Sequence, residues 1–445
     1  MHEAASTIAY IACRLNPIEI VTPKNLNEEK GSWILKAKEG RFCNPTFIYN
    51  TDLLSHIVGP KNQLMQANEQ LMQNIKPQSP IDSAVHEIIK SRIRDAITSI
   101  NMALGILTEN DYETTINATA KYGQLNRDQK SRANIISTCG RYVFGDFTSC
   151  FPEEQIARLK EITFDANAIH KQFQNALDYY IIEGWKIEID ASASSIGVRN
   201  KTADGVPRIV IPAHQEVDGL KLIELIGHEI ECHLRDSENA AQLFRDLLEN
   251  DSPLAPLIPV LAKSDNEILY EGHAKLSDVT IAGAKSLPRP FYTIAQIDAA
   301  EGYSFSHVAH HIYELQLDFF GKENVNIKGE DAEDVAIKSA WAATCSVFRG
   351  CTNTKNHCPY VFGKDYAYLA GFDIAYKTKH PEWLNFASLS LTDLRRLHDA
   401  GTRLNEPKYP AKNVAITTAN QLTGWPPSLS STTTARAFRS GGFLF

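Results

Sequence analysis

The chain has 445 residues, of which 43% are hydrophobic and 22% charged, a composition typical of a globular protein and too apolar for a disordered one. Its formal net charge of -8 argues against nucleic acid as a partner, because nucleic-acid binding needs a clustered basic surface. No apolar run approaches the ~18 residues that would span a bilayer. The start of the chain lacks the pattern of a secretory signal, and the eight scattered cysteines are expected to be reduced thiols. We therefore expect a cytoplasmic protein.

The first part of the chain, residues 1–180, is predicted to be mostly helical. Its clearest helix begins near Ser79, where the following proline suits a first turn. A further helical stretch is predicted to open at Phe151-Pro152 and to run toward Tyr180. The apolar residues of the first of these helices have the three- and four-residue spacing of one helix face, at Ile89, Ile93, Ile97, Ile100, Leu104 and Leu107.

A small sheet is predicted between the helical regions, over residues 185–212. Residues 186–190 alternate polar and apolar side chains with a period of two, which indicates a half-buried strand. Residues 196–199 are a candidate second strand. Residues 208–211 form a third, which Pro212 closes.

Two helices are predicted to follow the sheet. Asp218 is a plausible N-cap of the first, and Ser264 with Glu267 forms an S-x-x-E capping box for the second, which should run to about Val279. Residues 285–415 are again mainly helical, interrupted by a loop near 349–364. The apolar stripe of the first helix repeats every four residues, at Leu222, Ile226, Ile230 and Leu234.

The first of these two helices contains a candidate metal site. Residues 228–233 read H-E-I-E-C-H, so that His228 is followed directly by Glu229 and five residues later by His233. Two imidazoles with an adjacent carboxylate are typical of helical zinc peptidases. A catalytic zinc ion takes three protein ligands and lowers the pKa of water, and a neighbouring carboxylate can accept the proton.

The spacing of the two histidines differs from the familiar one of four residues. On a regular helix, residues five apart point ~140° away from each other and cannot share a metal ion. A π-bulge with i→i+5 hydrogen bonds would bring them onto one face, and such bulges favour functional sites. The H-E-x-x-x-H pattern therefore predicts a distorted helix between Gly227 and His233.

A third ligand is predicted in the second helix, where residues 270–274 read Y-E-G-H-A. Glu271 would complete a set of two histidines and one glutamate, and Gly272 could allow a close approach to the first helix because it adds no bulk. The alternative is that Glu271 is an ordinary exposed helix carboxylate.

Together these segments resemble the microtubule-associated tyrosine carboxypeptidase family, whose bacterial relatives carry a Q-E-G-L-A motif. The likeness covers residues of about 40 to 375. The matching segments are H-E-x-x-x-H at 228–233 and Y-E-G-x-A at 270–274, Asn44-Pro45-Thr46-Phe47 with Tyr49, Leu234-Arg235, Phe348-Arg349-Gly350, and Phe362-x-Lys364-Asp365-x-x-Tyr368-Leu369-x-Gly371.

The resemblance implies a zinc-dependent carboxypeptidase with His228, His233 and Glu271 as ligands and Glu229 as general base. Eukaryotic members of the family remove a C-terminal tyrosine from α-tubulin. The expected fold is α+β and predominantly helical, with a zincin-like core in which the small sheet packs on the motif helix. The expected regions are a helical one at 1–180, the zinc-binding core at 181–284, a helical region completing the active site at 285–415, and a Ser/Thr/Gly-rich tail at 416–445, either ordered or loose.

The chain departs from the family pattern at four places. Glu231 and Cys232 replace the small Gly and Thr of the usual H-E-I-G-T-H, and Y-E-G-H-A replaces Q-E-G-L-A. Arg235 follows His233 by two residues instead of three, and residues 238–240 replace an expected Asn-Gly. None of these changes removes a ligand or the base. We expect them to affect packing or substrate shape.

A carboxypeptidase must also bind a free C-terminal carboxylate, and arginine matches a carboxylate best. The C-terminal signature offers Arg349 and Lys364 for this role, and Tyr368 as a donor to the oxyanion of the tetrahedral intermediate. The alternatives are structural ion pairs and a core tyrosine.

Two further clusters are weaker metal candidates. His307 and His311 have i,i+4 spacing, but no glutamate follows His307, so packing or surface histidines are favoured. A second zinc site could form from a group with wide cysteine gaps, for which reduced, packed thiols are favoured. The members of that group are Cys345, Cys351, His357 and Cys358.

The motif residues thus predict a zinc metallopeptidase, and the resemblance implies that it acts on the C-terminus of a peptide or protein and removes one residue, tyrosine or another aromatic. An endopeptidase or aminopeptidase on the same metal centre remains an alternative. So does a zinc-binding regulatory protein with little catalysis.

Overall fold

The fold is described from a computed structural model. The helices and strands form a predominantly helical structure with two small sheets. Among the residues that the structure describes, no helix is both long and apolar enough to cross a membrane. The description covers the chain apart from residues 15–20, 123–148, 192, 194, 200–205, 249–251, 264–267, 284–289, 324–331, 352, 356–361, 363–365 and 426–445.

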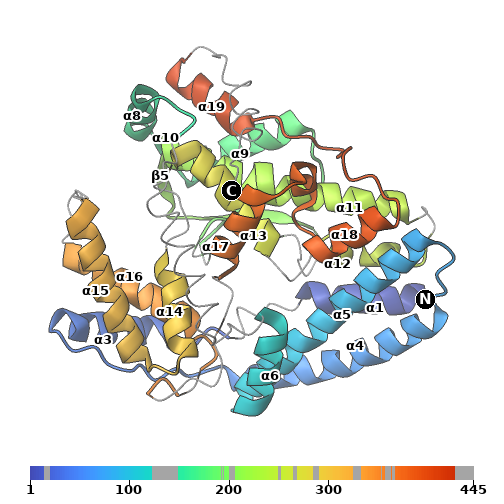
Figure 1. Ribbon diagram of the computed structural model, residues 1–445, viewed down its shortest axis with the longest axis horizontal. Helices are drawn as coiled ribbons and strands as arrows, with labels where there is room; N and C mark the ends of the chain where they lie inside the picture. The colour runs from blue at the N-terminus through green and yellow to red at the C-terminus, as the bar shows by residue number, and fades with distance from the viewer. Residues whose placement is uncertain are drawn as a thin grey trace.

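A large hydrophobic cluster joins the N-terminal helices to those of the C-terminal half, and in Figure 1 these helices form the lower part of the molecule. The helix predicted near Ser79 is confirmed as α5, and the Ser79 hydroxyl accepts the Asp82 N–H at 3.0 Å. The helices of this part are α1 (His2–Arg14), α3 (Leu26–Lys38), α4 (Leu54–Asn74), α5 (Pro80–Leu107), α6 (Asp111–Tyr122), α12 (Ile258–Leu261), α14 (Pro290–Ala300), α15 (Phe305–Glu323), α16 (Ala332–Val347), α17 (Tyr366–Lys377) and α18 (Leu391–Asp399), with short 3-10 turns η1 (Thr51–Leu53), η3 (Ala255–Leu257) and η6 (Pro381–Phe386).

A second hydrophobic cluster lies in the upper part of Figure 1 and contains both sheets. The helical stretch predicted from Phe151 toward Tyr180 is confirmed, but it consists of two helices with a short strand between them that was not predicted. Asp165 ends that strand and caps the second helix, accepting the Ala168 N–H at 2.8 Å. The elements are α8 (Glu153–Glu161), β1 (Thr163–Asp165) and α9 (Ala166–Tyr180), and β1 pairs antiparallel with β5 (Glu216–Asp218).

The three strands predicted over 185–212 are confirmed. They are β2 (Lys186–Asp190), β3 (Gly197–Arg199) and β4 (Arg208–Pro212), in the order β2-β4-β3. Strand β4 is central, parallel to β2 and antiparallel to β3, with Val198 opposite Ile209. The side chains of Ile209, Val210 and Ile211 are buried, which makes β4 the strand that fixes the sheet in the core.

The helix predicted after the sheet is a continuous rod of three segments. Asp218 is confirmed as its N-cap and accepts the Lys221 N–H at 2.7 Å. The rod consists of α10 (Gly219–Leu225), the π-helix η2 (Ile226–Leu234) and α11 (Arg235–Leu247). After η3 and α12 comes α13 (Ile268–Ala282), the second predicted helix, while the predicted capping pair Ser264 and Glu267 lies outside the described residues.

The last described helix, α19 (Val414–Thr423), packs on the second cluster near α10 and α8 (Figure 1). It crosses the boundary at 415/416 that the sequence suggested for a Ser/Thr/Gly-rich tail. That segment is therefore ordered in its first part, and residues 426–445 of the expected tail lie outside the described residues.

Candidate metal centre

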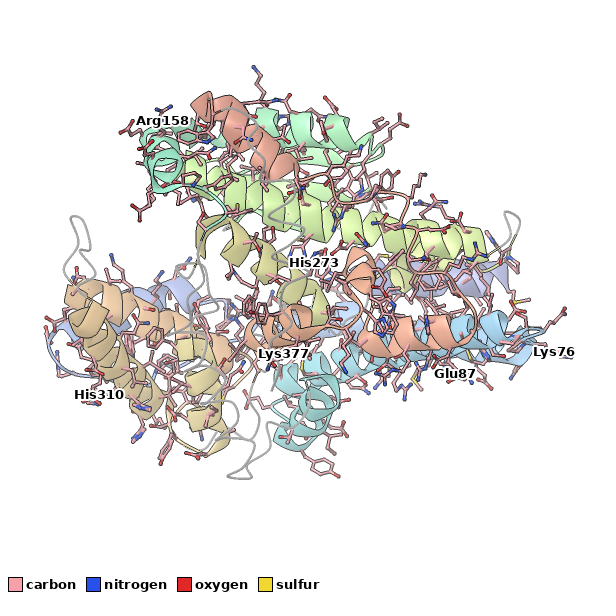
Figure 2. All side chains as sticks on the ribbon, turned by 45° about the horizontal axis from the view of Figure 1, so that its top comes forward. Lys76, Glu87, Arg158, His273, His310 and Lys377 are labelled. Atoms are coloured by element: carbon pink, nitrogen blue, oxygen red, sulfur yellow. The ribbon has the colours of Figure 1, made fainter. Side chains whose placement is uncertain are left out.

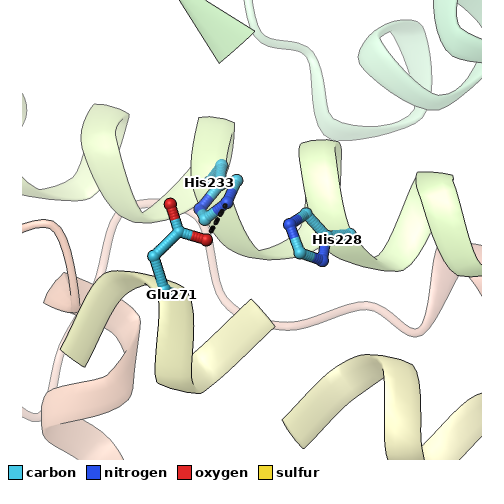
Figure 3. A group of neighbouring side chains, drawn as sticks. All are labelled: His228, His233 and Glu271. Carbon is cyan, nitrogen blue, oxygen red and sulfur yellow. Dashed lines mark ion pairs between the residues drawn. The ribbon is translucent and has the colours of Figure 1, made fainter. Parts of the chain in front are cut away.

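Three predicted ligands converge on one point. His228 and His233 extend from η2 and Glu271 from α13, as Figure 3 shows. One ligand atom from each of the three residues lies within 4.8 Å of the others, and His233 Nε2 is 3.6 Å from Glu271 Oε2. His233 and Glu271 are buried, whereas His228 is partly accessible. In the described part of the chain this is the one group with the composition and spacing of a metal site.

The predicted helix distortion is confirmed. A π-helix covers Ile226–Leu234, and it includes the whole H-E-x-x-x-H segment. Bonding from i to i+5 brings residues five apart onto the same face. The ring centroids of His228 and His233 are 4.7 Å apart, with the ring planes at 89°. The five-residue spacing is therefore compatible with one shared ion.

Gly227 permits the close packing of η2 against α13. A Cβ atom at this position would lie 2.7 Å from Ser277 Oγ and 2.6 Å from Ile281 Cδ1. At the other end of the segment, the buried Tyr270 hydroxyl donates to the His233 carbonyl at 3.2 Å, and its ring stacks on the imidazole with centroids 3.9 Å apart. These contacts fix His233 from the helix that carries Glu271.

Gly272 has a different neighbour from the one predicted. A Cβ atom on Gly272 would lie 2.1 Å from the backbone carbon and oxygen of Gly371, and a Cβ atom on Gly371 would lie 1.9 Å from the Ile268 oxygen. The space that Gly272 leaves free is therefore filled by α17 and not by the motif helix. The glycine instead lets α13 and α17 touch through their backbones, and Gly227 supplies the approach to the motif helix.

The orientation of His228 is set by Asp278, which sequence reasoning missed. Its Nδ1 lies 3.1 and 3.2 Å from the two Asp278 oxygens, so the other ring nitrogen, Nε2, faces the site. Lys275 donates to the same carboxylate at 2.7 Å. A carboxylate behind a metal-binding imidazole fixes the tautomer and ring orientation. Asp278 is seven residues after Glu271, hence on the same helix face, and this spacing is the signal that could have found it.

The charges of Asp278, His228 and Lys275 also shift one another's pKa values. Burial disfavours a charged imidazole, but the Asp278 carboxylate outweighs that effect and raises the pKa of His228 to about 9. Burial alone would raise the pKa of Asp278, whereas the charges of His228 and Lys275 hold it well below its usual range. Asp278 therefore stays ionised and remains an acceptor for the Nδ1 proton.

Glu229 lies beside the three ligands and is also buried. Its Oε2 accepts the Val198 backbone N–H of β3 at 3.1 Å, while its Oε1 is 4.0 Å from His228 Nε2. Opposed residues of an antiparallel pair alternate between hydrogen-bonded and unbonded positions. Val198 lies on edge strand β3, and its N–H donates to Glu229 instead of to a neighbouring strand. In this way β3 holds the Glu229 carboxylate next to the candidate metal ligands.

A cavity of about 940 Å³ opens on this group, with His228, Glu229 and Asp278 in its wall. Arg349 and Tyr368, which the sequence placed on the C-terminal signature, line the same cavity. The Arg349 guanidinium lies 5.9 Å from the centre of the Phe362 ring. Lys364, the other candidate for the substrate carboxylate, lies outside the described residues.

Lys275 is a further basic residue of the cavity wall that the sequence analysis did not single out. Its Nζ lies 5.9 Å from the centre of the Tyr368 ring. Burial lowers the pKa of a lysine, but the charge of Asp278 outweighs burial here and raises it. Lys275 therefore stays charged and is paired with the Asp278 carboxylate in the same wall.

The N-terminal Asn-Pro segment lies against the loops around α15 and α16. Asn44 accepts the Ser306 N–H at 2.8 Å, Thr354 donates to the Pro45 carbonyl, and Tyr49 donates to the Cys351 carbonyl at 3.2 Å. These contacts are structural: the segment joins α3 to the part of the protein that carries Arg349.

The residues that depart from the family pattern have structural partners. Cys232 is buried and its thiol donates to the His273 carbonyl at 3.7 Å. Glu238 accepts the Trp185 indole N–H at 2.9 Å, and Arg235 contacts Asp236 at 3.2 Å. Glu231 contacts α9 and α19.

The competing histidine cluster does not gather around a metal position. His311 is bound to Asp298 at 2.6 Å, His307 stacks on Tyr303, and the exposed His310 lies near Glu314 at 3.7 Å. Figure 2 places His310 on the outer side of α15, far from His273 at the centre of the molecule. The interpretation as packing and surface histidines agrees with these contacts.

The cysteine cluster is described only in part. Cys345 and Cys351 are free, buried thiols, and Cys351 donates to the Asn353 carbonyl at 3.2 Å. Burial raises the pKa of Cys345 to about 12, so that it remains a neutral thiol. His357 and Cys358 lie outside the described residues.

The donor set fits zinc by its chemistry. Two imidazoles and one carboxylate are a common set for a catalytic zinc ion, whose ligands at about 2.0–2.2 Å lie about 3.4 Å from one another. The 3.6 Å between His233 Nε2 and Glu271 Oε2 is close to that value. His233 Nδ1 is buried without a hydrogen-bond partner in the described structure, and the ring is held by stacking on Tyr270 and by its contact with Glu271 through Nε2.

Comparison with models of known protein families gives no match, and no curated protein matches the chain. The resemblance to tyrosine carboxypeptidases therefore rests on the motif residues themselves.

Proposed function

We propose that the chain is a zinc-dependent metallocarboxypeptidase that removes one C-terminal residue, tyrosine or another aromatic, from a peptide or protein. The observation that carries the proposal is the convergence of His228, His233 and Glu271, next to a cavity whose wall contains His228, Glu229, Arg349 and Tyr368. The placement of β3 against the motif helix supports a zincin-like core.

A zinc ion held by His228, His233 and Glu271 would polarise the scissile carbonyl and lower the pKa of water. Glu229 is placed to accept a proton from the attacking water and to pass it to the departing amine. Its Oε2 is held by the Val198 N–H, which leaves Oε1 toward His228 as the oxygen that exchanges the proton. Burial and the hydrogen bond keep this carboxylate in one orientation.

The remaining cavity residues are assigned to substrate binding. Arg349 pairs with the free carboxylate of the substrate, because a guanidinium binds a carboxylate through two parallel hydrogen bonds. Tyr368 donates to the oxyanion of the tetrahedral intermediate on the substrate. A cavity of about 940 Å³ is large enough for an aromatic side chain, since small-molecule sites generally measure about 300–1,000 Å³.

The test compares wild type with Glu229→Gln in a C-terminal proteomic analysis of cell extract. Wild type is expected to shorten substrates by one C-terminal residue, and the variant to retain zinc but be slower by about 10²–10⁴-fold. Internal cuts would instead identify an endopeptidase, and shortened N-termini an aminopeptidase. Zinc bound without any cleavage would favour the regulatory alternative.

A second experiment tests the role of Arg349. It uses a peptide that the wild-type protein cleaves, once with a free C-terminal carboxylate and once with that carboxylate amidated. Wild type should cleave only the free acid. The Arg349→Gln variant should show a raised KM for the free acid with zinc still bound. Equal cleavage of both peptides by wild type would contradict recognition of a free carboxylate.

A further inference from the structure

Glu231 stands between the two histidines in sequence but makes its contacts on the other side of the helix. One carboxylate oxygen, Oε1, accepts the Tyr180 hydroxyl at 3.0 Å and the Val414 N–H at 2.6 Å. The other, Oε2, accepts the Ala415 N–H at 3.3 Å. The side chain therefore ties η2 to α9 and to the start of α19.

These bonds replace the missing cap of α19. The first N–H groups of a helix have no partner within it and favour a negative charge nearby. The N-cap residue Asn413 is in the left-handed region, with φ at 53°, and its side chain makes no capping hydrogen bond. Glu231 supplies the carboxylate from another element. Tyr180 extends the connection, since its hydroxyl also accepts the Lys412 N–H at 3.1 Å.

The π-helix needs such external contacts. Runs of π-helix are rare, usually one turn long, and η2 extends over nine residues. Its polar side chains are held on separate sides: Glu229 by β3, His228 by α13, and Glu231 by α9 and α19. If η2 relaxed to a regular α-helix, His228 and His233 would diverge by ~140°.

We propose that Glu231 is a positioning residue, through which the C-terminal helix α19 holds η2 in the π-helical form that brings His228 and His233 together. The inference rests on the metal centre of the proposed function. It gives a role to one of the positions at which the chain departs from H-E-I-G-T-H, where the small glycine could make no such contact.

The test is the Glu231→Gln substitution in the full chain, with Glu238→Gln as the matched control. Both glutamates accept hydrogen bonds on the same rod and are mostly shielded, but Glu238 contacts Trp185 and not α19. Glu231→Gln is expected to weaken zinc binding about 10- to 100-fold, the usual effect of losing an outer contact of a metal site. It should also change the visible spectrum of the Co²⁺-substituted protein. The control should change neither.

Amide hydrogen exchange of the metal-free protein gives a readout that does not depend on zinc. Exchange should accelerate in residues 226–234 and 413–423 of the Glu231→Gln variant, and not in the control. Tyr180→Phe keeps the aromatic ring in the core but removes the hydroxyl that donates to Glu231. It should also weaken zinc binding and accelerate exchange, and it replaces Glu231→Gln as the test variant if that protein does not fold.

The outcomes separate this inference from the proposed function. Unchanged exchange and unchanged zinc affinity in Glu231→Gln would overturn the role of Glu231, as would equal losses in Glu231→Gln and Glu238→Gln. Failure of wild type to bind zinc would refute the metal centre, and with it the positioning role. Zinc binding by wild type without peptidase activity would refute only the proposed catalysis.

Discussion

The contact between Gly272 and Gly371 gives a sharp test of how α13 positions Glu271. A Cβ atom added by Gly272→Ala would lie 2.1 Å from backbone atoms of α17, where carbon atoms normally stay at least about 3.5 Å apart. Because the obstructing atoms are backbone, no side chain can rotate away. The two helices must separate by more than 1 Å or the residue next to Glu271 must shift by a comparable amount.

This displacement is large for a metal site, where ligand distances hold within about 0.2 Å. We expect Gly272→Ala to lower the free energy of unfolding by about 1–3 kcal/mol, the usual cost of overpacking. We also expect zinc affinity to fall by more than the loss of stability explains, because Glu271 is the adjacent residue. Competition with a chromophoric zinc chelator measures the affinity, and thermal unfolding of the metal-free protein measures the stability.

Gly31→Ala is the matched control. Gly31 lies inside α3 and a Cβ atom there would meet nothing within 4 Å, so alanine should raise stability by about 0.5–1 kcal/mol through helix propensity. Its zinc affinity should equal that of wild type. A Gly272→Ala protein with wild-type stability and wild-type zinc affinity would refute the argument that backbone contact with α17 positions Glu271.

Three further predictions concern other contacts. Asp278→Asn should weaken zinc binding about 10- to 100-fold in a chelator competition, because it removes the carboxylate that orients His228, and an unchanged affinity would contradict that role. Ile181→Gly should raise the free energy of unfolding by about 1 kcal/mol in a denaturant titration, since this exposed β-branched residue has a φ of 58°; a loss of stability would show that its side chain contributes more than the backbone costs. Arg92→Met should destabilise the protein by about 3–5 kcal/mol in the same assay, because it leaves the buried Asp393 carboxylate without its 2.7 Å partner, whereas a neutral result would mean that water or another group replaces the arginine.

The local parts of the fold could be predicted because their signals are local. Asp218 and Ser79 cap helices whose apolar residues follow them directly, and the alternation at 186–190 reports one strand on its own. The strand β1 has only three residues and pairs with β5 more than fifty residues away. Three residues are too few for an alternating strand pattern to be recognised. The sequence from 153 to 180 therefore looked helical throughout.

In the candidate site, too, the features that depend on neighbouring residues could be predicted, and those that depend on distant residues could not. The π-helix could be predicted because two histidines five residues apart can share an ion only in that form, so chemistry supplied what helix propensity could not. The partner of Gly272 could not be predicted, since a glycine shows that something lies close but not what it is. The contacts of Glu231 with α19 were likewise invisible, because nothing near Glu231 in sequence indicates a helix start almost two hundred residues later.

The candidate metal centre owes its geometry to packing, and this predicts how the protein responds to a chelator. His233 is stacked on Tyr270, His228 is bonded to Asp278, and Glu271 is set by the contact of α13 with α17. None of these contacts needs an ion. Chelation should therefore leave the far-UV circular dichroism unchanged, in contrast to small zinc domains that unfold without metal.

Zinc should still stabilise the protein by mass action, by about 2.7 kcal/mol at a free concentration of one hundred times Kd. Thermal melts at a series of zinc concentrations would show this as a rising Tm above a folded metal-free baseline. Loss of helical signal on chelation would mean that the ion, and not the surrounding packing, holds the ligand-bearing helices in their folded form. In that case Glu231→Gln would have to be compared with wild type in the zinc-bound state, and a role of α19 in preorganising the ligands would be excluded.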